Sequence, residues 1–247
     1  FGSAPDVKPY GLLYQWGRKD PFPSAPSLTG NEKTQPVPVY GPDGTEVKIT
    51  YSLWSSVENN TIEYSIANPT KCLSNYAQYN TSRDWLKATD SNDALWGNPK
   101  GGERNSDNNY VNKGSKSFYD PCPVGYRVPP ADVFRTFTTT GGYTQDPSSF
   151  DVVDLNGDGV IDTRDYNYGW SFNMKEGSLF FPAAARYDGS YAMLMGSKSG
   201  LWGSYWGNSP AKSYGATTGF GFCVLAFMNE AAGTSVSATA SAGRADA

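Results

Sequence analysis

The sequence predicts a fold of short strands joined by long loops, and not a helical bundle. Charged residues make up only 18% of the chain and aromatic residues 15%, and there are 27 glycines and 17 prolines, a composition that favours many short elements. After residue 177, three short apolar and aromatic runs are each bounded by Gly, Ser, Asn or Pro, as strands are. The length of 247 residues is compatible with one large all-β or α+β domain or with two ordinary ones.

The charge and the missing residue types narrow the possible functions. The net charge is −4, so there is no basic field to gather phosphates, and we expect neither nucleic acid nor an anionic membrane surface as a partner. The chain has no histidine, which removes the commonest general base and most zinc chemistry. The longest apolar run, residues 220–228, is far shorter than the roughly 20 residues of a membrane-spanning helix, so we expect no membrane insertion of this segment.

Strand signals continue through the first half of the chain. Residues 10–16, which include Leu12, are too apolar to face water together and predict a strand or short helix pressed on the core. Residues 37–40 and 46–53 flank a Gly-Pro-Asp-Gly turn signal, and the second run alternates as a half-buried strand does, which predicts a hairpin. Residues 97–115 have almost no apolar content and predict an exposed loop.

Prolines fix the path of the middle of the chain. Residues 119–130 read YDPCPVGYRVPP, which forbids a helix and predicts a fixed extended segment. A helix can begin at the last of these prolines, because a proline in the first turn loses no hydrogen bond. In that helix Val133, Phe134 and Phe137 are expected to lie on one face.

The strongest chemical motif is a calcium-loop pattern at residues 154–165. Oxygen-bearing side chains, a central glycine and a following apolar residue fall at the spacing of such a loop. The predicted ligands are the side chains of Asp154, Asn156, Asp158, Asp162 and Asp165 and the backbone carbonyl of Val160. Calcium would neutralise the four carboxylates and hold together an insertion near residues 143–170. A plain acidic turn is the alternative.

The last position of this loop is aspartate where glutamate is usual, and in that respect it is similar to the loops of dockerin modules. A dockerin needs two loops to present its partner-binding helices, whereas this chain has one. We therefore interpret the motif as a structural insertion.

Four further motifs carry a resemblance to a known family. They are residues 13–18 (LYQWGR), 120–129 (DPCPVGYRVP), 181–187 (FPAAARY) and 205–210 (YWGNSP). In this order they resemble the bacterial "major paralogous" family of surface lipoproteins and fimbrial tip proteins, and the resemblance covers nearly the whole chain. It implies an α+β fold of the C-type-lectin-like kind, with small twisted antiparallel sheets, one or two helices and long loops. It also implies a single domain over residues 1–247, export to the bacterial cell surface or beyond it, and ligand binding.

The ends of the chain depart from that family. Residues 243–247 resemble the lead-in to the family's closing strand, and the chain starts abruptly at Phe1, so we expect the natural chain to extend beyond both ends. Alternatively, residues 221–224 are a divergent closing strand. Under the first interpretation the family's partner for Cys122 lies outside this sequence. Three cysteines leave at least one without an intrachain partner, and the pairing of Cys72, Cys122 and Cys223 stays open.

The segment from residue 202 onward is also unusual for the family. Its residue choices resemble the variable region of proteins that a diversity-generating retroelement diversifies, which also use a C-type-lectin-like scaffold near the C-terminus. In such proteins loop residues vary while strand residues stay fixed. We predict that Trp202, Tyr205 and Trp206 belong mainly to the framework.

The binding residues are predicted in loops beside the C-terminal strands. Recognition needs only a few well-placed polar or aromatic anchors. The candidates are Ser204, Asn208, Lys212, Ser213, Tyr214, Thr217, Thr218, Met228, Asn229 and Glu230. A solvated loop surface without a partner is the alternative for any single one of them. The segment lacks the Glu-Pro-Asn and Trp-Asn-Asp type of arrangement that sugar binding through calcium needs.

These inferences predict a non-catalytic adhesin or receptor-binding domain whose ligand is an extracellular protein or a glycan. Two alternatives stay open. A carbohydrate-active enzyme would use a pair among the 24 acidic residues, although no spacing singles out two of them. A structural pilus subunit would have other pilus subunits as its partners and would bind no ligand.

Overall fold

The computed structural model describes residues 10–24, 39–47, 50–52, 60–73, 84–86, 93–101, 106, 111–141, 149–188, 193–194, 200–213, 216–225, 235–237 and 241–243. Over this part of the chain the architecture is α+β, with small, mostly antiparallel sheets and few helices, which confirms the predicted class at that level. The helices are α1 (Ile62–Ala67) and the 3-10 helices η3 (Ala131–Phe137) and η5 (Thr163–Asp165).

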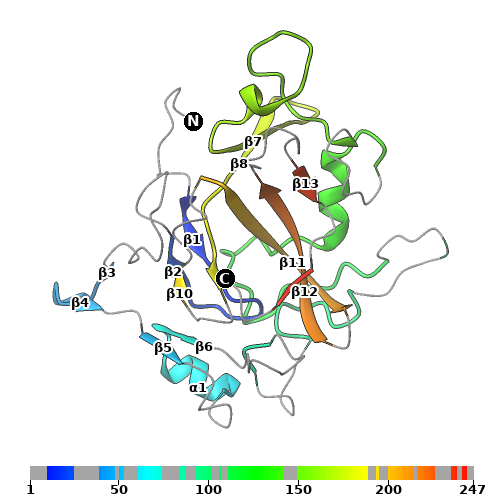
Figure 1. Cartoon of the computed structure of the whole chain (residues 1–247). Coiled ribbons are helices and arrows are strands. Elements are labelled where there is room, and N and C mark those ends of the chain that lie inside the picture. Colours follow the sequence, from blue (N-terminus) through cyan, green and yellow to red (C-terminus); the bar gives the residue numbers. More distant parts are fainter. Residues whose placement is uncertain are drawn as a thin grey trace.

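Most strands form isolated two-stranded pairs. Antiparallel pairs join β1 (Leu12–Leu13) to β2 (Phe22–Pro23), β3 (Val39–Tyr40) to β4 (Glu46–Val47), β7 (Gly169–Asn173) to β8 (Ser178–Pro182), and β9 (Tyr187–Asp188) to β10 (Met193–Leu194). β5 (Thr50–Ser52) and β6 (Lys71–Leu73) pair in parallel and lie beside α1 (Figure 1). The largest described sheet contains β11 (Trp202–Ser213), β12 (Ala216–Leu225), β13 (Ser235–Ser237) and β14 (Ser241–Gly243).

The long hairpin of β11 and β12 is the central element of that sheet (Figure 1). Its antiparallel register runs from Trp202 opposite Leu225 to Ser213 opposite Ala216, with a bulge between Trp206 and Pro210. β13 and β14 pair with successive parts of β12. Two of the three apolar runs predicted as strands are therefore β11 and β12, and the third is β8.

Three hydrophobic clusters form the described core. The first joins η3 to β7 and includes Phe134, Phe137, Trp170 and Phe172. The second lies around β1, β2 and β9, and the third around Trp16, Trp85 and Trp96. Large aromatic side chains therefore fill the interior of a fold whose sheets are too small to bury much surface alone.

The helix predicted after the proline-rich segment exists, but its geometry differs from the prediction. η3 is a 3-10 helix in which Ala131, Phe134 and Phe137 are buried at intervals of three, whereas Val133 is 38% exposed. The prediction that Val133 shares the buried face was wrong. A 3-10 helix has 3.0 residues per turn, so side chains three apart eclipse one another, and Val133 points elsewhere.

Of the other local predictions, one is confirmed in part and two need correction. The hairpin is confirmed in β3 and β4, where the amide of Gly41 donates to the Thr45 carbonyl, but the next strand, β5, pairs in parallel with β6 instead. Leu12 is 54% exposed, so not every apolar residue of 10–16 lies against the core. Within the predicted exposed loop 97–115, Asn98 is fully buried, which corrects that prediction at one important position.

In the part of the chain that the structure describes, no helix has the length and apolar character needed to cross a bilayer.

Candidate functional site

Two of the four sequence motifs meet through tryptophan hydrogen bonds. The indole Nε1 of Trp16 donates to the carbonyl of Gly207 at 2.9 Å, and the indole Nε1 of Trp206 donates back to the carbonyl of Tyr14 at 2.9 Å. Trp16 is fully buried, and Trp206 is half-buried against the same cluster. Residues 13–18 and 205–210 are therefore held together reciprocally, although about 190 residues of chain separate them.

The other two motifs join the same junction. In the bulge of β11, the amide of Asn208 donates to the carbonyl of Pro129 at 2.8 Å, and the hydroxyl of Ser209 accepts from the amide of Ala131 at 3.2 Å. The hydroxyl of Tyr205 donates to the carbonyl of Pro182. We call these contacts the framework junction. They tie the first half of β11 to all three other motifs, so this half of the strand is a fixed part of the structure.

Asn208 belongs to the framework junction and not to an exposed binding surface. Its side chain is fully buried, and its Oδ1 accepts from Nδ2 of the buried Asn98 at 2.9 Å. A Cβ on Gly101 would lie 2.4 Å from the same Nδ2 and 2.8 Å from the Cα of Ser209, so the backbone packs tightly around this amide pair. The prediction that Asn208 contacts a ligand from a loop was wrong, because no ligand can reach a fully buried side chain.

The remaining predicted binding residues divide into three groups. Ser204 lies in β11, is half-buried, and accepts a hydrogen bond from the Trp202 indole at 2.8 Å. Lys212 and Ser213 in β11 lie opposite Thr217 and Ala216 in β12, so they are strand residues and not loop residues as predicted. Thr218 follows in β12 and pairs with β14. The others, Tyr214, Met228, Asn229 and Glu230, lie outside the described residues.

The predicted framework aromatic residues are half-buried and in contact with the core. The ring of Tyr205 packs edge-on against Phe181 with centroids 4.8 Å apart. Trp202 is half-buried beneath the guanidinium of Arg186, which lies 4.6 Å from its ring centroid. Their contacts agree with a framework role.

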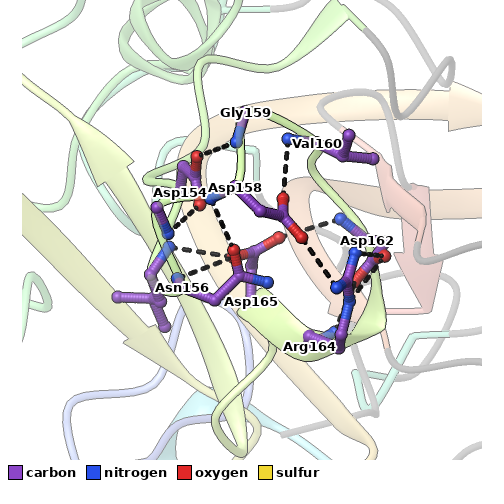
Figure 2. Close-up of polar contacts among 10 residues, drawn as sticks. Asp154, Asn156, Asp158, Gly159, Val160, Asp162, Arg164 and Asp165 are labelled. Atoms are coloured by element: carbon purple, nitrogen blue, oxygen red, sulfur yellow. Dashed lines mark hydrogen bonds and ion pairs between the residues drawn. The ribbon is translucent and has the colours of Figure 1, made fainter.

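The predicted calcium loop is closed by hydrogen bonds from its own backbone (Figure 2). Asp154 accepts from the amides of Gly157 at 2.6 Å and Gly159 at 2.7 Å, and Asp158 accepts from the amide of Val160 at 2.9 Å. Hydrogen bonds from Gly159 and Gly157 hold the pKa of the Asp154 carboxyl below its usual range. The loop thus has a defined path in which its oxygens face backbone donors.

Asp165 fixes both ends of this loop. Its side chain is fully buried and accepts from the amides of Leu155 at 2.8 Å and Asp162 at 2.9 Å. With the Asp162 side chain it forms a reciprocal capping box at the start of η5. The sequence pattern marked Asp165 as a metal ligand, and in the structure it is also the residue that closes the loop.

Arg164 neutralises two of the predicted metal ligands. Its guanidinium lies 2.7 Å from Oδ2 of Asp158 and 2.6 Å from Oδ2 of Asp162 (Figure 2). Hydrogen bonds from Arg164 lower the pKa of the Asp162 carboxyl, and Asp162 in turn raises the pKa of the guanidinium. Among the residues that the structure describes, no group of three or more Cys, Asp or Glu side chains has the geometry of a metal centre. A cation would have to displace the guanidinium.

The proline-rich segment contains a buried charge that the sequence reasoning missed. Asp120 is 2% exposed, and its carboxylate accepts from Lys116 Nζ at 2.8 Å and from the amides of Cys122 and Val128 at 2.9 Å each. The thiol of Cys122 is free, and burial, together with the nearby Asp120, raises its pKa. The sequence signal for this anchor is an aspartate directly before Pro-Cys-Pro, because an aspartate side chain commonly accepts from the backbone amide two residues later.

A second missed feature is a pocket of about 120 Å³ whose lining includes Trp85 and Leu95 of the third core cluster. It lies between the residues after β1, helix α1 and the exposed ring of Phe118. Its lining comes from five separate segments of the chain, and of these only the first overlaps a sequence motif, at residues 17–18.

The chain matches no family model, no curated protein and no solved structure in comparisons with known proteins.

Proposed function

We propose that this chain is a non-catalytic, surface-displayed binding domain with a C-type-lectin-like fold, which presents the far half of the β11–β12 hairpin to an extracellular protein or glycan. The observation that supports the proposal is the anchoring of this hairpin. Its near half, through the bulge at residues 207–209, is fixed by the framework junction. Beyond the bulge, β11 continues through Lys212 and Ser213 to a connection at residues 214–215.

Such an arrangement suits recognition. Strand residues held on a fixed framework are preorganised, and preorganised anchors lose little entropy on binding. The proposed surface is therefore reduced from the sequence-based set. It keeps Lys212, Ser213, Tyr214, Thr217 and Thr218 in the far half of the hairpin, and Met228, Asn229 and Glu230, which follow the near end of β12 in the sequence. Ser204 lies at its margin, and Asn208 is omitted. Diversification of this region by a retroelement is part of the same proposal.

A binding screen with a catalytic readout tests this function. The purified chain is applied to a printed glycan array and to a panel of extracellular matrix and cell-surface proteins, and the same glycans are assayed for hydrolysis. We expect saturable binding to at least one ligand and no change in its covalent structure. Hydrolysis would establish the enzyme alternative, and polymerisation of the chain without any ligand would establish the pilus-subunit alternative.

We also propose that residues 154–165 bind calcium. The donor set fits a hard cation, since it consists of the carboxylates of Asp154, Asp158, Asp162 and Asp165, the amide oxygen of Asn156 and the carbonyl of Val160. The loop is already closed by Asp165, and Arg164 balances part of the negative charge. Calcium would take the place of the guanidinium at Asp158 and Asp162, and the metal would have a structural role.

Calcium is expected to raise the melting temperature of the chain, because a ligand that binds only the folded state stabilises it by mass action. Differential scanning calorimetry with calcium and with a chelator measures the shift. The Asp158→Asn variant should lose most of the shift, and Glu176→Gln, which removes an exposed carboxylate outside the loop, should retain it. Identical melting of the unaltered chain with and without calcium would contradict the proposed site.

A further inference from the structure

The pocket beside α1 has the size of a single amino-acid side chain. Its volume is about 120 Å³, whereas pockets for drug-sized molecules are about 300–1,000 Å³. Its apolar walls include Ile66 of α1, Trp85, Leu95, Phe118 and Tyr119. None of its lining residues lies in β11 or β12, so it is distinct from the proposed binding surface.

The rim of the pocket exposes apolar groups that are nevertheless held in place. Phe118 is 78% exposed and Ile66 is 55% exposed, whereas Trp85 is 1% exposed. The ring of Phe118 packs edge-on against Tyr119 with centroids 5.6 Å apart, and Lys19 Nζ lies 4.4 Å from its centroid. When an apolar group fills the pocket, it covers part of the exposed Phe118 ring, and this burial of apolar surface is favourable.

The polar side of the pocket carries excess positive charge. Arg18 is 2% exposed, and its guanidinium lies 3.8 Å from Oδ2 of Asp20. Among the described residues no acceptor reaches the buried Nε of Arg18. Lys19 adds an exposed second cation, so two positive groups and one carboxylate line this side. This charge is complementary to a carboxylate.

We propose that the pocket binds the C-terminal residue of a peptide chain, with its apolar side chain between Phe118 and Ile66 and its carboxylate beside the exposed Lys19, while the buried Arg18 adds positive charge behind the pocket wall. A C-terminal residue is the occupant that combines an apolar group of this size with a carboxylate a few ångströms away. Backbone and basic groups capture peptide termini in this manner in other recognition domains. The inference does not depend on the function of the β11–β12 hairpin.

N-acetyl-leucine is the minimal probe for this site, and its binding can be followed by 1H–15N NMR of the Trp85 indole and of the Lys19 and Phe118 amides. We expect saturable shifts with a dissociation constant on the order of millimolar, as a ligand of this size allows. N-acetyl-leucinamide, which lacks the carboxylate, should bind about five times more weakly. The Lys19→Met variant should reduce that preference for the acid.

Two matched variants distinguish binding of the probe in the pocket from non-specific contact with exposed aromatic rings. Phe118→Ala is expected to weaken N-acetyl-leucine binding by about tenfold, because one wall of the pocket is lost. Tyr126→Ala removes a comparably exposed ring, 71% exposed, that does not line the pocket, and it should leave binding unchanged. The proposal is overturned if the probe gives no saturable shift, if Phe118→Ala binds equally well, or if methyl glucoside binds in preference to N-acetyl-leucine.

Discussion

Replacing Arg18 by alanine is expected to lower the free energy of unfolding by about 3–5 kcal/mol, the range typical of breaking a buried charged network. The Nη1 of Arg18 donates to the carbonyl of Lys71 at 2.6 Å and to Oε1 of Gln15 at 2.9 Å. The Nη2 lies 3.4–3.5 Å from the carbonyls of Ser65, Asn68 and Pro69 at the end of α1. The last carbonyls of a helix have no intrahelical donor, and the guanidinium of Arg18 supplies hydrogen-bond donors to them at the C-terminus of α1.

The shape of the guanidinium matters as well as its charge. Arg18 also stacks 5.2 Å from the Phe22 ring centroid and 5.8 Å from that of Trp85, and burial lowers the pKa of the guanidinium. Lysine at this position would keep a cation but lose the planar fork and the stacking, so Arg18→Lys should still cost about 2–3 kcal/mol.

Equilibrium urea unfolding measures both changes. Arg127 supplies a control, because its exposed side chain donates to a single carbonyl, that of Gly114, and Arg127→Ala should cost less than about 1 kcal/mol. An Arg18→Ala variant as stable as Arg127→Ala would show that the buried guanidinium does not hold α1 against the core.

Replacing Asp120 by asparagine is the second large change, with an expected loss of about 2–3 kcal/mol at neutral pH. The amide would keep one acceptor oxygen but lose the charge that faces Lys116 and one of the backbone hydrogen bonds from Cys122 and Val128. The proline-rich segment would then lack its central anchor. Since this segment meets the bulge of β11 at Pro129, the damage should extend to the framework junction.

This contribution should depend on pH. Burial opposes ionisation of Asp120, but the hydrogen bonds from Lys116 and from the amides of Val128 and Cys122 outweigh it and hold the pKa of the carboxyl below its usual value. Stabilisation by a carboxylate with a lowered folded-state pKa is complete above the unfolded pKa of about 3.9, and it disappears as the pH falls through the folded pKa.

Urea unfolding of the unaltered chain and of Asp120→Asn at several pH values tests this sign. The difference in stability should be constant near neutral pH and should shrink below about pH 4. The exposed Asp43, whose carboxylate accepts only from Thr45, is a control whose substitution by asparagine should have a much smaller effect. A difference that grows as the pH falls would contradict the assignment.

The sequence predicted elements well where the pattern was local. The three apolar runs within residues 177–190, 201–210 and 220–227 each contain a strand, β8, β11 and β12. β11 and β12 also extend through residues 211–213 and 216–219, which were predicted as loop. The Gly-Pro-Asp-Gly turn, also a local pattern, gave the β3–β4 hairpin. These signals predicted a strand-rich fold, and the α+β class was implied by the family resemblance. The pairing of β5 with β6 joins distant segments and has no local signature.

Tertiary contacts explain the predictions that failed. Phe134 and Phe137 are three residues apart, a spacing that suits the buried face of an α-helix as well as that of a 3-10 helix. Only the packing of the folded chain shows that the helix is 3-10 and that Ala131 completes its buried face. Asn208 is in a polar, small-residue stretch that is typical of a loop, yet it pairs with Asn98, which lies 110 residues away. Polar residues in a bulge of an otherwise apolar junction can be buried when a distant amide satisfies them.

Binding by a variant of the proposed surface, here called the hairpin variant, tests the central claim most directly. The change of Lys212, Tyr214 and Asn229 together to alanine is compared with a composition-matched control, Lys175, Tyr40 and Asn167 to alanine, which are exposed at other sites. Biolayer interferometry against the ligand found in the screen, with the melting temperature of each sample, supplies the two readouts. We predict that the hairpin variant loses binding with an unchanged melting temperature and that the control retains both. Retained binding by the hairpin variant would contradict the account.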